Sequence, residues 1–266
     1  MNALGQDRAR QTTVTVSLVV CIVGSMYGAG VFGPPAVADA AGGALAADAT
    51  LLAPGGPAFS IWSLVYLGLA VYTVWQWLPA QTGASRHRRT GWLAAASMLL
   101  NCAWLLTVRG DLLWLSVVVI VALVLVLGLV VARLADDPPG SRADAWITDG
   151  TFGLYTGWVA VATCANVTAV LVDAGVRPDR ALAEAAALAV LAVVGVLALA
   201  LARRTRGNVG IGLAMGWGLA WIAVGRLTDA PESTVVGAGA LVVAVFALAV
   251  PAWVTSRTTR AARSAP

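Results

Sequence analysis

The residues of this sequence best suited to bind a ligand are aromatic and amide side chains that recur at helical spacing. Members that lie three or four positions apart share one face of a helix. Aromatic faces stack on flat apolar molecules, and amide or phenol groups orient them, so the set predicts small-molecule binding. Taken singly, an amide in a helical bundle more often makes an interhelical hydrogen bond worth about 0.6–2 kcal/mol. The set comprises Trp62, Tyr66, Asn101, Trp104, Tyr155, Trp158 and Asn166.

The sequence lacks most side chains that enzymes use for bond-making chemistry. All 17 basic residues are Arg, which excludes a Lys Schiff base, a Lys nucleophile and a phosphate-loop Lys. The single His, His87, stands in the run Arg86-His87-Arg88-Arg89, which we interpret as a solvated loop. One His supplies neither bis-His haem ligation nor a His-based metal site. We expect no catalytic residue, no metal site and no required cofactor.

The elements that must position these side chains are predicted to be transmembrane helices. Of the 266 residues, 59% are hydrophobic and 11% are charged, too few charges for a soluble domain of this length. Several segments run for about 20 residues without a charge, which is the length that crosses the hydrocarbon core of a bilayer. Such long apolar segments are typical of helices and not of barrel strands. The predicted spans are 12–32, 58–79, 90–108, 111–134, 149–172, 181–203, 208–226 and 233–254.

The distribution of Arg predicts the orientation of these spans. The two termini and the second, fourth and sixth connections hold 13 of the 17 Arg, and the other connections hold four. This asymmetry places both termini in the cytoplasm. It also explains the net charge of +4 without a nucleic-acid partner. We expect an integral protein of the bacterial plasma membrane. The four Arg on the predicted outer side are Arg109, Arg177, Arg180 and Arg226.

This orientation brings the three groups of aromatic and amide residues to similar depths. At about 1.5 Å per residue, Trp62 lies about 6 Å and Tyr66 about 12 Å below the outer end of their helix. Asn101 and Trp104 reach the outer half of the membrane from the inner side, whereas Trp158 lies near mid-depth and Asn166 near the outer side. If the three helices are neighbours, the groups converge beneath the first outer loop, residues 33–57. Loops of this length often cover functional sites.

Three motifs in this order resemble those of the tryptophan-rich sensory protein / translocator protein family, which includes the mitochondrial benzodiazepine-binding protein. They are PAFSIWSLVY at 57–66, LNCAW at 100–104 and YTGWVAVATCAN at 155–166. The sequence departs from the family pattern at Leu154, where the family usually has Pro, and it lacks the Trp that usually precedes the second helix. We therefore interpret the chain as an enlarged and divergent member.

The resemblance implies an all-α, polytopic membrane bundle with a five-helix translocator-like core over 1–174. A three-helix extension with a short basic tail follows at 175–266. It further implies that the seven residues above bind a porphyrin or another flat hydrophobic molecule in a pocket under the first outer loop. The lipid bilayer, this small-molecule ligand and a second copy in a homodimer are the implied partners. On this hypothesis the protein is a non-enzymatic sensor or translocator that carries a bound tetrapyrrole.

Two alternatives stay open. The protein is a facilitated transporter of a hydrophobic molecule, or an enzyme that degrades porphyrin in light with Trp residues as redox partners. The absence of paired carboxylates at mid-membrane argues against ion-coupled transport but not against facilitated movement. The lack of acid–base and metal residues argues against hydrolysis but not against photochemistry.

Overall fold

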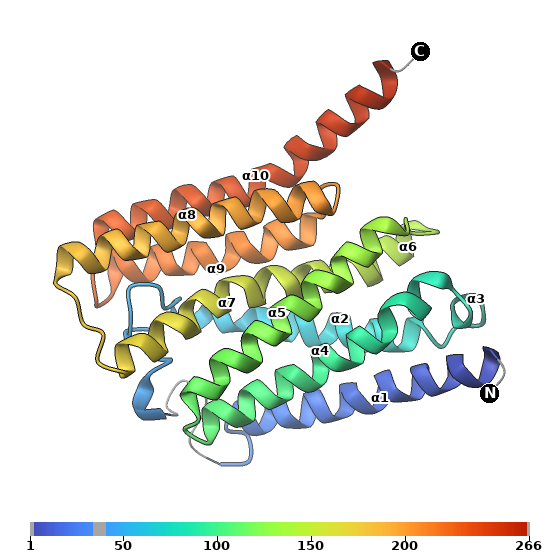
Figure 1. Ribbon diagram of the computed structural model, residues 1–266, viewed down its shortest axis with the longest axis horizontal. Helices are drawn as coiled ribbons and strands as arrows, with labels where there is room; N and C mark the ends of the chain where they lie inside the picture. Colours follow the sequence, from blue (N-terminus) through green and yellow to red (C-terminus); the bar gives the residue numbers. More distant parts are fainter. Residues whose placement is uncertain (1–2, 34–40, 265–266) are drawn as a thin grey trace. The chain divides into compact units, whose positions relative to one another are not determined.

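The computed structural model describes residues 3–33 and 41–264, and these residues form helices and connections without a β-strand (Figure 1). Eight helical segments in this part of the chain are long and apolar enough to cross a membrane, each overlapping one predicted span. The predicted all-α, polytopic membrane fold is therefore confirmed. The elements are α1 (Ala3–Gly28), η1 (Ala41–Gly43), η2 (Gly56–Ser60), α2 (Ile61–Trp75), α3 (Pro79–Thr82), α4 (Ser85–Arg109), α5 (Leu113–Asp136), α6 (Arg142–Asp144), the π-helical turn η3 (Ala145–Gly150), α7 (Thr151–Asp173), α8 (Arg180–Arg204), α9 (Val209–Thr228) and α10 (Thr234–Ser264).

The chain forms two compact units. The first comprises Met1–Gly43 and Trp62–Phe152, and in it α4 packs between α1 and α5. Small residues bring α1 close to α4. A Cβ at Gly28 would lie 2.8 Å from Leu105 of α4, and a Cβ at Gly24 would overlap the Sγ of Cys102. Glycine at both positions thus permits the backbones to approach more closely than any larger residue would.

The second unit comprises Ala44–Ile61 and Gly153–Pro266. In Figure 1, α8, α9 and α10 run alongside one another, and all three pairs are in contact. Helix α9 also packs on α7, where a Cβ at Gly157 would overlap the carbonyl of Ile211. On its other side, a Cβ at Gly212 would lie 2.6 Å from the carbonyl of Ala247 in α10. Pro251 has no amide hydrogen for that carbonyl, and α10 bends in its C-terminal part.

One local prediction is wrong, and one helix extends beyond its predicted span. Helix α1 begins at Ala3, well before the predicted membrane span at 12–32. Helix α4 begins at Ser85, so Arg86 and His87 lie in its first turn, where His87 is fully buried instead of solvated in a loop. Both extensions have one physical cause, which is that the charges at these helix ends pair with one another.

Two other predictions are not decided. Residues 34–40 of the predicted first loop lie outside the described residues. The division into a core at 1–174 and an extension at 175–266 stays a prediction.

Candidate functional site

Four of the seven predicted binding residues lie in the first unit, and the structure brings three of them together. The amide Nδ2 of Asn101 donates to the Tyr66 hydroxyl at 3.1 Å and lies 3.5 Å from the Sγ of Cys21. The ring of Trp62 stacks on that of Tyr66, with centroids 5.3 Å apart and planes inclined by 14°. The fourth residue, Trp104, is buried one turn further along α4. Helices α1, α2 and α4 therefore meet at a polar group beside an aromatic stack.

The amide of Asn101 has an unused acceptor. Asn101 is fully buried, and its Oδ1 has no hydrogen-bond partner among the residues that the structure describes. Leaving a buried polar atom unpaired costs about 1–3 kcal/mol. An N–H or O–H group brought by a ligand would remove that cost. Trp62 is half-buried, and its ring lies beside this amide through its stack on Tyr66.

The other three predicted residues, Tyr155, Trp158 and Asn166, lie along α7 in the second unit and are all buried. Trp158 meets Phe59 edge to face, with ring centroids 5.8 Å apart. Gly218 of α9 lies directly against it, since a Cβ there would be 3.4 Å from the Trp158 ring. Because these three residues belong to a different unit from the group around Asn101, the single pocket formed by all seven stays a prediction.

The first-loop segment, Ala44–Ser60, is fastened to α9 by a buried Arg. The Arg226 guanidinium donates to the carbonyls of Thr50 at 2.7 Å and Ala47 at 2.9 Å. Its side chain is 1% exposed. From the sequence, Arg226 is predicted only to mark the outer side of the membrane. Its position near the end of an apolar helix indicates that it could be buried. The sequence does not indicate its partners, because Thr50 and Ala47 lie far away in the chain.

Two tryptophans of α9 hold the same segment further along. Trp217 donates from Nε1 to the carbonyl of Ala58 at 2.9 Å, and the amide of Gly55 donates to the carbonyl of Trp221 at 3.2 Å. A Cβ at Gly55 would lie 3.2 Å from the Trp221 ring, so the segment approaches α9 closely. These contacts show that α9 positions the first-loop segment.

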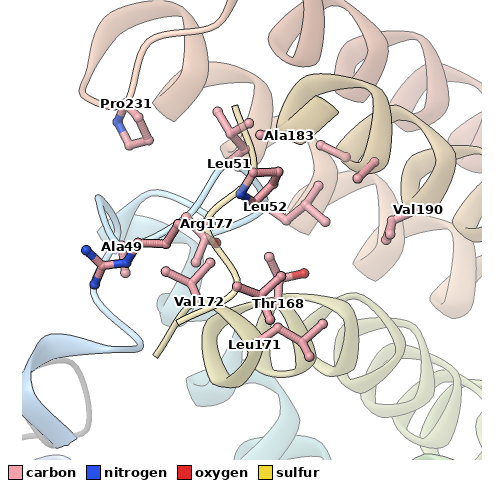
Figure 2. A pocket seen from close by; sticks show the side chains of 15 residues that line it. Ala49, Leu51, Leu52, Thr168, Leu171, Val172, Arg177, Ala183, Val190 and Pro231 are labelled. Atoms are coloured by element: carbon pink, nitrogen blue, oxygen red, sulfur yellow. The ribbon is translucent and has the colours of Figure 1, made fainter. Parts of the chain in front are cut away.

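An apolar pocket of about 340 Å³ lies in the second unit, where the first-loop segment meets the facing ends of α7 and α8 (Figure 2). We call it the α7–α8 pocket. None of the seven predicted binding residues lines it, and no signal in the sequence indicated it. Its lining comprises Ala49, Thr50, Leu51, Leu52, Thr168, Leu171, Val172, Val176, Arg177, Pro178, Ala183, Ala186, Ala187, Val190 and Pro231.

The first unit also contains a cluster of ion pairs in which Arg86, Asp144, Asp7 and Arg10 are buried and Arg88 is half exposed. Arg86 of α4 lies 3.3 Å from a carboxylate oxygen of Asp144 and 2.7 Å from one of Asp149. Arg88 forms a bidentate contact with Asp7 of α1, at 2.9 and 2.6 Å.

The Asp7 carboxylate also pairs with Arg10 at 3.2 Å, so three Arg face three Asp. This balance is typical of a structural network. Within the described residues, no group of His, Cys or acidic side chains is arranged to hold a metal ion.

These features define the class of protein: an integral membrane protein with buried aromatic and amide residues, in which eight helices of the described residues are long and apolar enough to span the membrane. A sequence model of the TSPO-like protein family matches residues 11–253. The chain therefore belongs to the TSPO-like family, and the match extends beyond the three motifs into α8, α9 and α10. No curated protein and no solved structure matched the chain.

Proposed function

We propose that this protein binds a planar hydrophobic molecule of the tetrapyrrole class and acts as a membrane sensor or translocator for it. The observation that carries the proposal is the buried Asn101 amide. Its nitrogen donates to the hydroxyl of Tyr66, on which the ring of Trp62 stacks, and its oxygen Oδ1 has no hydrogen-bond partner among the described residues. An aromatic face next to one polar group matches the form of many small-molecule sites. Membership of the TSPO-like family supports the ligand class.

The chemistry of these residues favours recognition over catalysis. Indole and phenol rings offer large flat surfaces at low entropic cost, so they suit a rigid macrocycle. The Asn101 oxygen accepts a hydrogen bond, which pyrrole N–H or propionic O–H groups can supply. The partners of the Asn101 amide nitrogen are the Tyr66 hydroxyl and the Cys21 thiol, and neither is a carboxylate or an imidazole.

The test is a titration of the purified, full-length protein with protoporphyrin in darkness, followed by quenching of Trp fluorescence. The wild-type protein should give saturable quenching. Trp62→Ala should weaken binding about tenfold, because an aromatic stacking contact contributes about 0.5–1.5 kcal/mol beyond area burial. Asn101→Leu should weaken it by a similar factor. The matched control is Trp114→Ala, which removes an exposed indole from α5 in the same unit.

Non-saturable quenching, or equal affinities of Trp62→Ala, Asn101→Leu and the Trp114 control, would contradict the proposal. The same titration under illumination tests the enzymatic alternative. On that alternative, the porphyrin should lose its absorbance in light with the wild-type protein but not with Trp62→Ala. Ligand flux into proteoliposomes that lack any ion gradient would support facilitated transport as the mode of action.

A further inference from the structure

The α7–α8 pocket has a lining that does not suit a flat aromatic ligand. Apart from Thr50, Thr168 and Arg177, its walls are Ala, Leu, Val and Pro, and no aromatic residue is among the 15 that line it. A volume of about 340 Å³ lies at the lower end of the range for small-molecule pockets. Branched aliphatic side chains give an irregular surface without a planar face. Such a surface fits a flexible alkyl chain, which adapts its shape, better than a rigid macrocycle.

The pocket has one charged residue, Arg177, in the connection between α7 and α8. This side chain is exposed and forms no hydrogen bond or ion pair with any residue that the structure describes. Figure 2 shows it pointing toward Ala49 of the first-loop segment, which also lines the pocket. No carboxylate lines the pocket, so Arg177 is the one charged side chain that an anion placed there would meet among the lining residues.

The polar and apolar parts of the pocket are separated along the helix axis. Arg177 lies just before the start of α8 at Arg180, whereas Val190 lies ten residues into that helix. At 1.5 Å per residue this separation is about 15 Å. On α7, Thr168 and Leu171 line the pocket within the last two turns of the helix. The charge thus lies at the helix ends, where a membrane meets water, and the apolar walls extend toward the hydrocarbon.

We propose that the α7–α8 pocket binds a single-chain anionic amphiphile, a long-chain carboxylate, with its tail between α7 and α8 and its carboxylate paired with Arg177. This site shares no residue with the aromatic and amide residues of the proposed tetrapyrrole function, and it takes a different class of ligand. The aliphatic walls select the flexible tail, and the lone Arg177 selects an anionic head over a neutral one. The length of the apolar wall favours one chain that enters from the interface.

The test uses the full-length protein in nanodiscs of zwitterionic phosphatidylcholine, with a long-chain carboxylate that carries a photoreactive diazirine near the end of its tail. Cross-linked peptides are mapped by mass spectrometry. Labelling should saturate and should fall on peptides that contain Leu171–Val172 or Ala183–Val190. Palmitate should compete with it, and methyl palmitate, which has the same tail without the charge, should compete at least fivefold less well.

Two kinds of variant separate the charged and apolar parts of the site. Arg177→Gln should raise the concentration for half-maximal labelling about fivefold, the upper range for an exposed ion pair. Arg180→Gln, which alters a neighbouring Arg that does not line the pocket, should leave it unchanged. Val190→Trp should abolish labelling by filling the pocket, whereas Val193→Trp, at an exposed position of α8 outside the pocket, should not. Leu171→Trp, at a residue that is already exposed, repeats the test if Val190→Trp fails to fold.

Equal competition by palmitate and its methyl ester would overturn the proposal, because the pocket would then be an unselective lipid groove. Competition by phosphatidylglycerol but not by palmitate would overturn it in favour of a phospholipid. If labelling is unchanged in both Val190→Trp and Leu171→Trp, the carboxylate binds outside the α7–α8 pocket and the proposal is wrong. Since protoporphyrin quenching should be the same in Val190→Trp as in the wild-type protein, a loss of quenching would also contradict the separation of the two sites.

Discussion

The buried ion pairs of the first unit give the largest expected effect of a single substitution, and Arg86 is the residue to change. The Arg86 side chain is 5% exposed, and its terminal nitrogen lies 2.8 and 2.7 Å from the two carboxylate oxygens of Asp149. Its Nε lies 3.3 Å from Asp144, whose side chain is 6% exposed. One guanidinium therefore balances two carboxylates, one of which has almost no access to water.

Arg86→Met keeps most of the aliphatic volume and removes the charge. Deleting one partner of a buried ion pair costs about 3–5 kcal/mol, mainly because the remaining charge is left without compensation. The Asp144 carboxylate keeps one hydrogen bond, from the Thr148 hydroxyl at 2.8 Å, which offsets only part of that cost. We therefore expect the free energy of unfolding to fall by about 3 kcal/mol or more.

The assay is reversible unfolding in mixed detergent micelles, followed by helical circular dichroism. The matched control is Arg89→Met, because Arg89 lies three residues further along α4 with an exposed side chain, and we expect a change below about 0.5 kcal/mol. The triple variant Arg86→Met, Asp144→Asn, Asp149→Asn should recover most of the lost stability. A loss below about 1 kcal/mol for Arg86→Met, or a triple variant no more stable than it, would refute this account of the cluster.

Three further outcomes follow from other parts of the structure. Arg226→Met removes the donor that holds the first-loop segment, so the rate of amide hydrogen exchange in that segment should rise about tenfold. An unchanged exchange rate would show that Arg226 does not hold the segment. Gly24→Val should destabilise the protein by about 1–3 kcal/mol, because the added side chain would push α1 away from α4. Gly128→Val should not, because a Cβ at that position has no neighbouring atom within 4 Å. In intact cells, an impermeant maleimide should label Glu232→Cys but not Gly140→Cys; the reverse pattern would invert the predicted topology.

The spanning helices could be predicted from the sequence because the length and apolarity of a segment are local properties. The transmembrane parts of α5 and α8 are almost without charge, and their predicted bounds are within a few residues of the observed ones. The helices extend furthest beyond the predicted spans at α1 and α4, where charged residues continue the helix beyond its apolar part. A run of Arg beside one His has the composition of a solvated loop. Only its partners, Asp7 and Asp149, make it part of a buried helix.

The same division applies to the candidate site. Sequence spacing alone determined that Trp62 and Tyr66 share one face of a helix, because helical geometry relates neighbours three and four residues apart. Tertiary structure decided that this face meets Asn101, that Arg226 holds the first-loop segment, and that an aliphatic pocket lies beside that segment. These contacts join residues far apart in the chain. They depend on which helices pack together, and no local pattern encodes that choice.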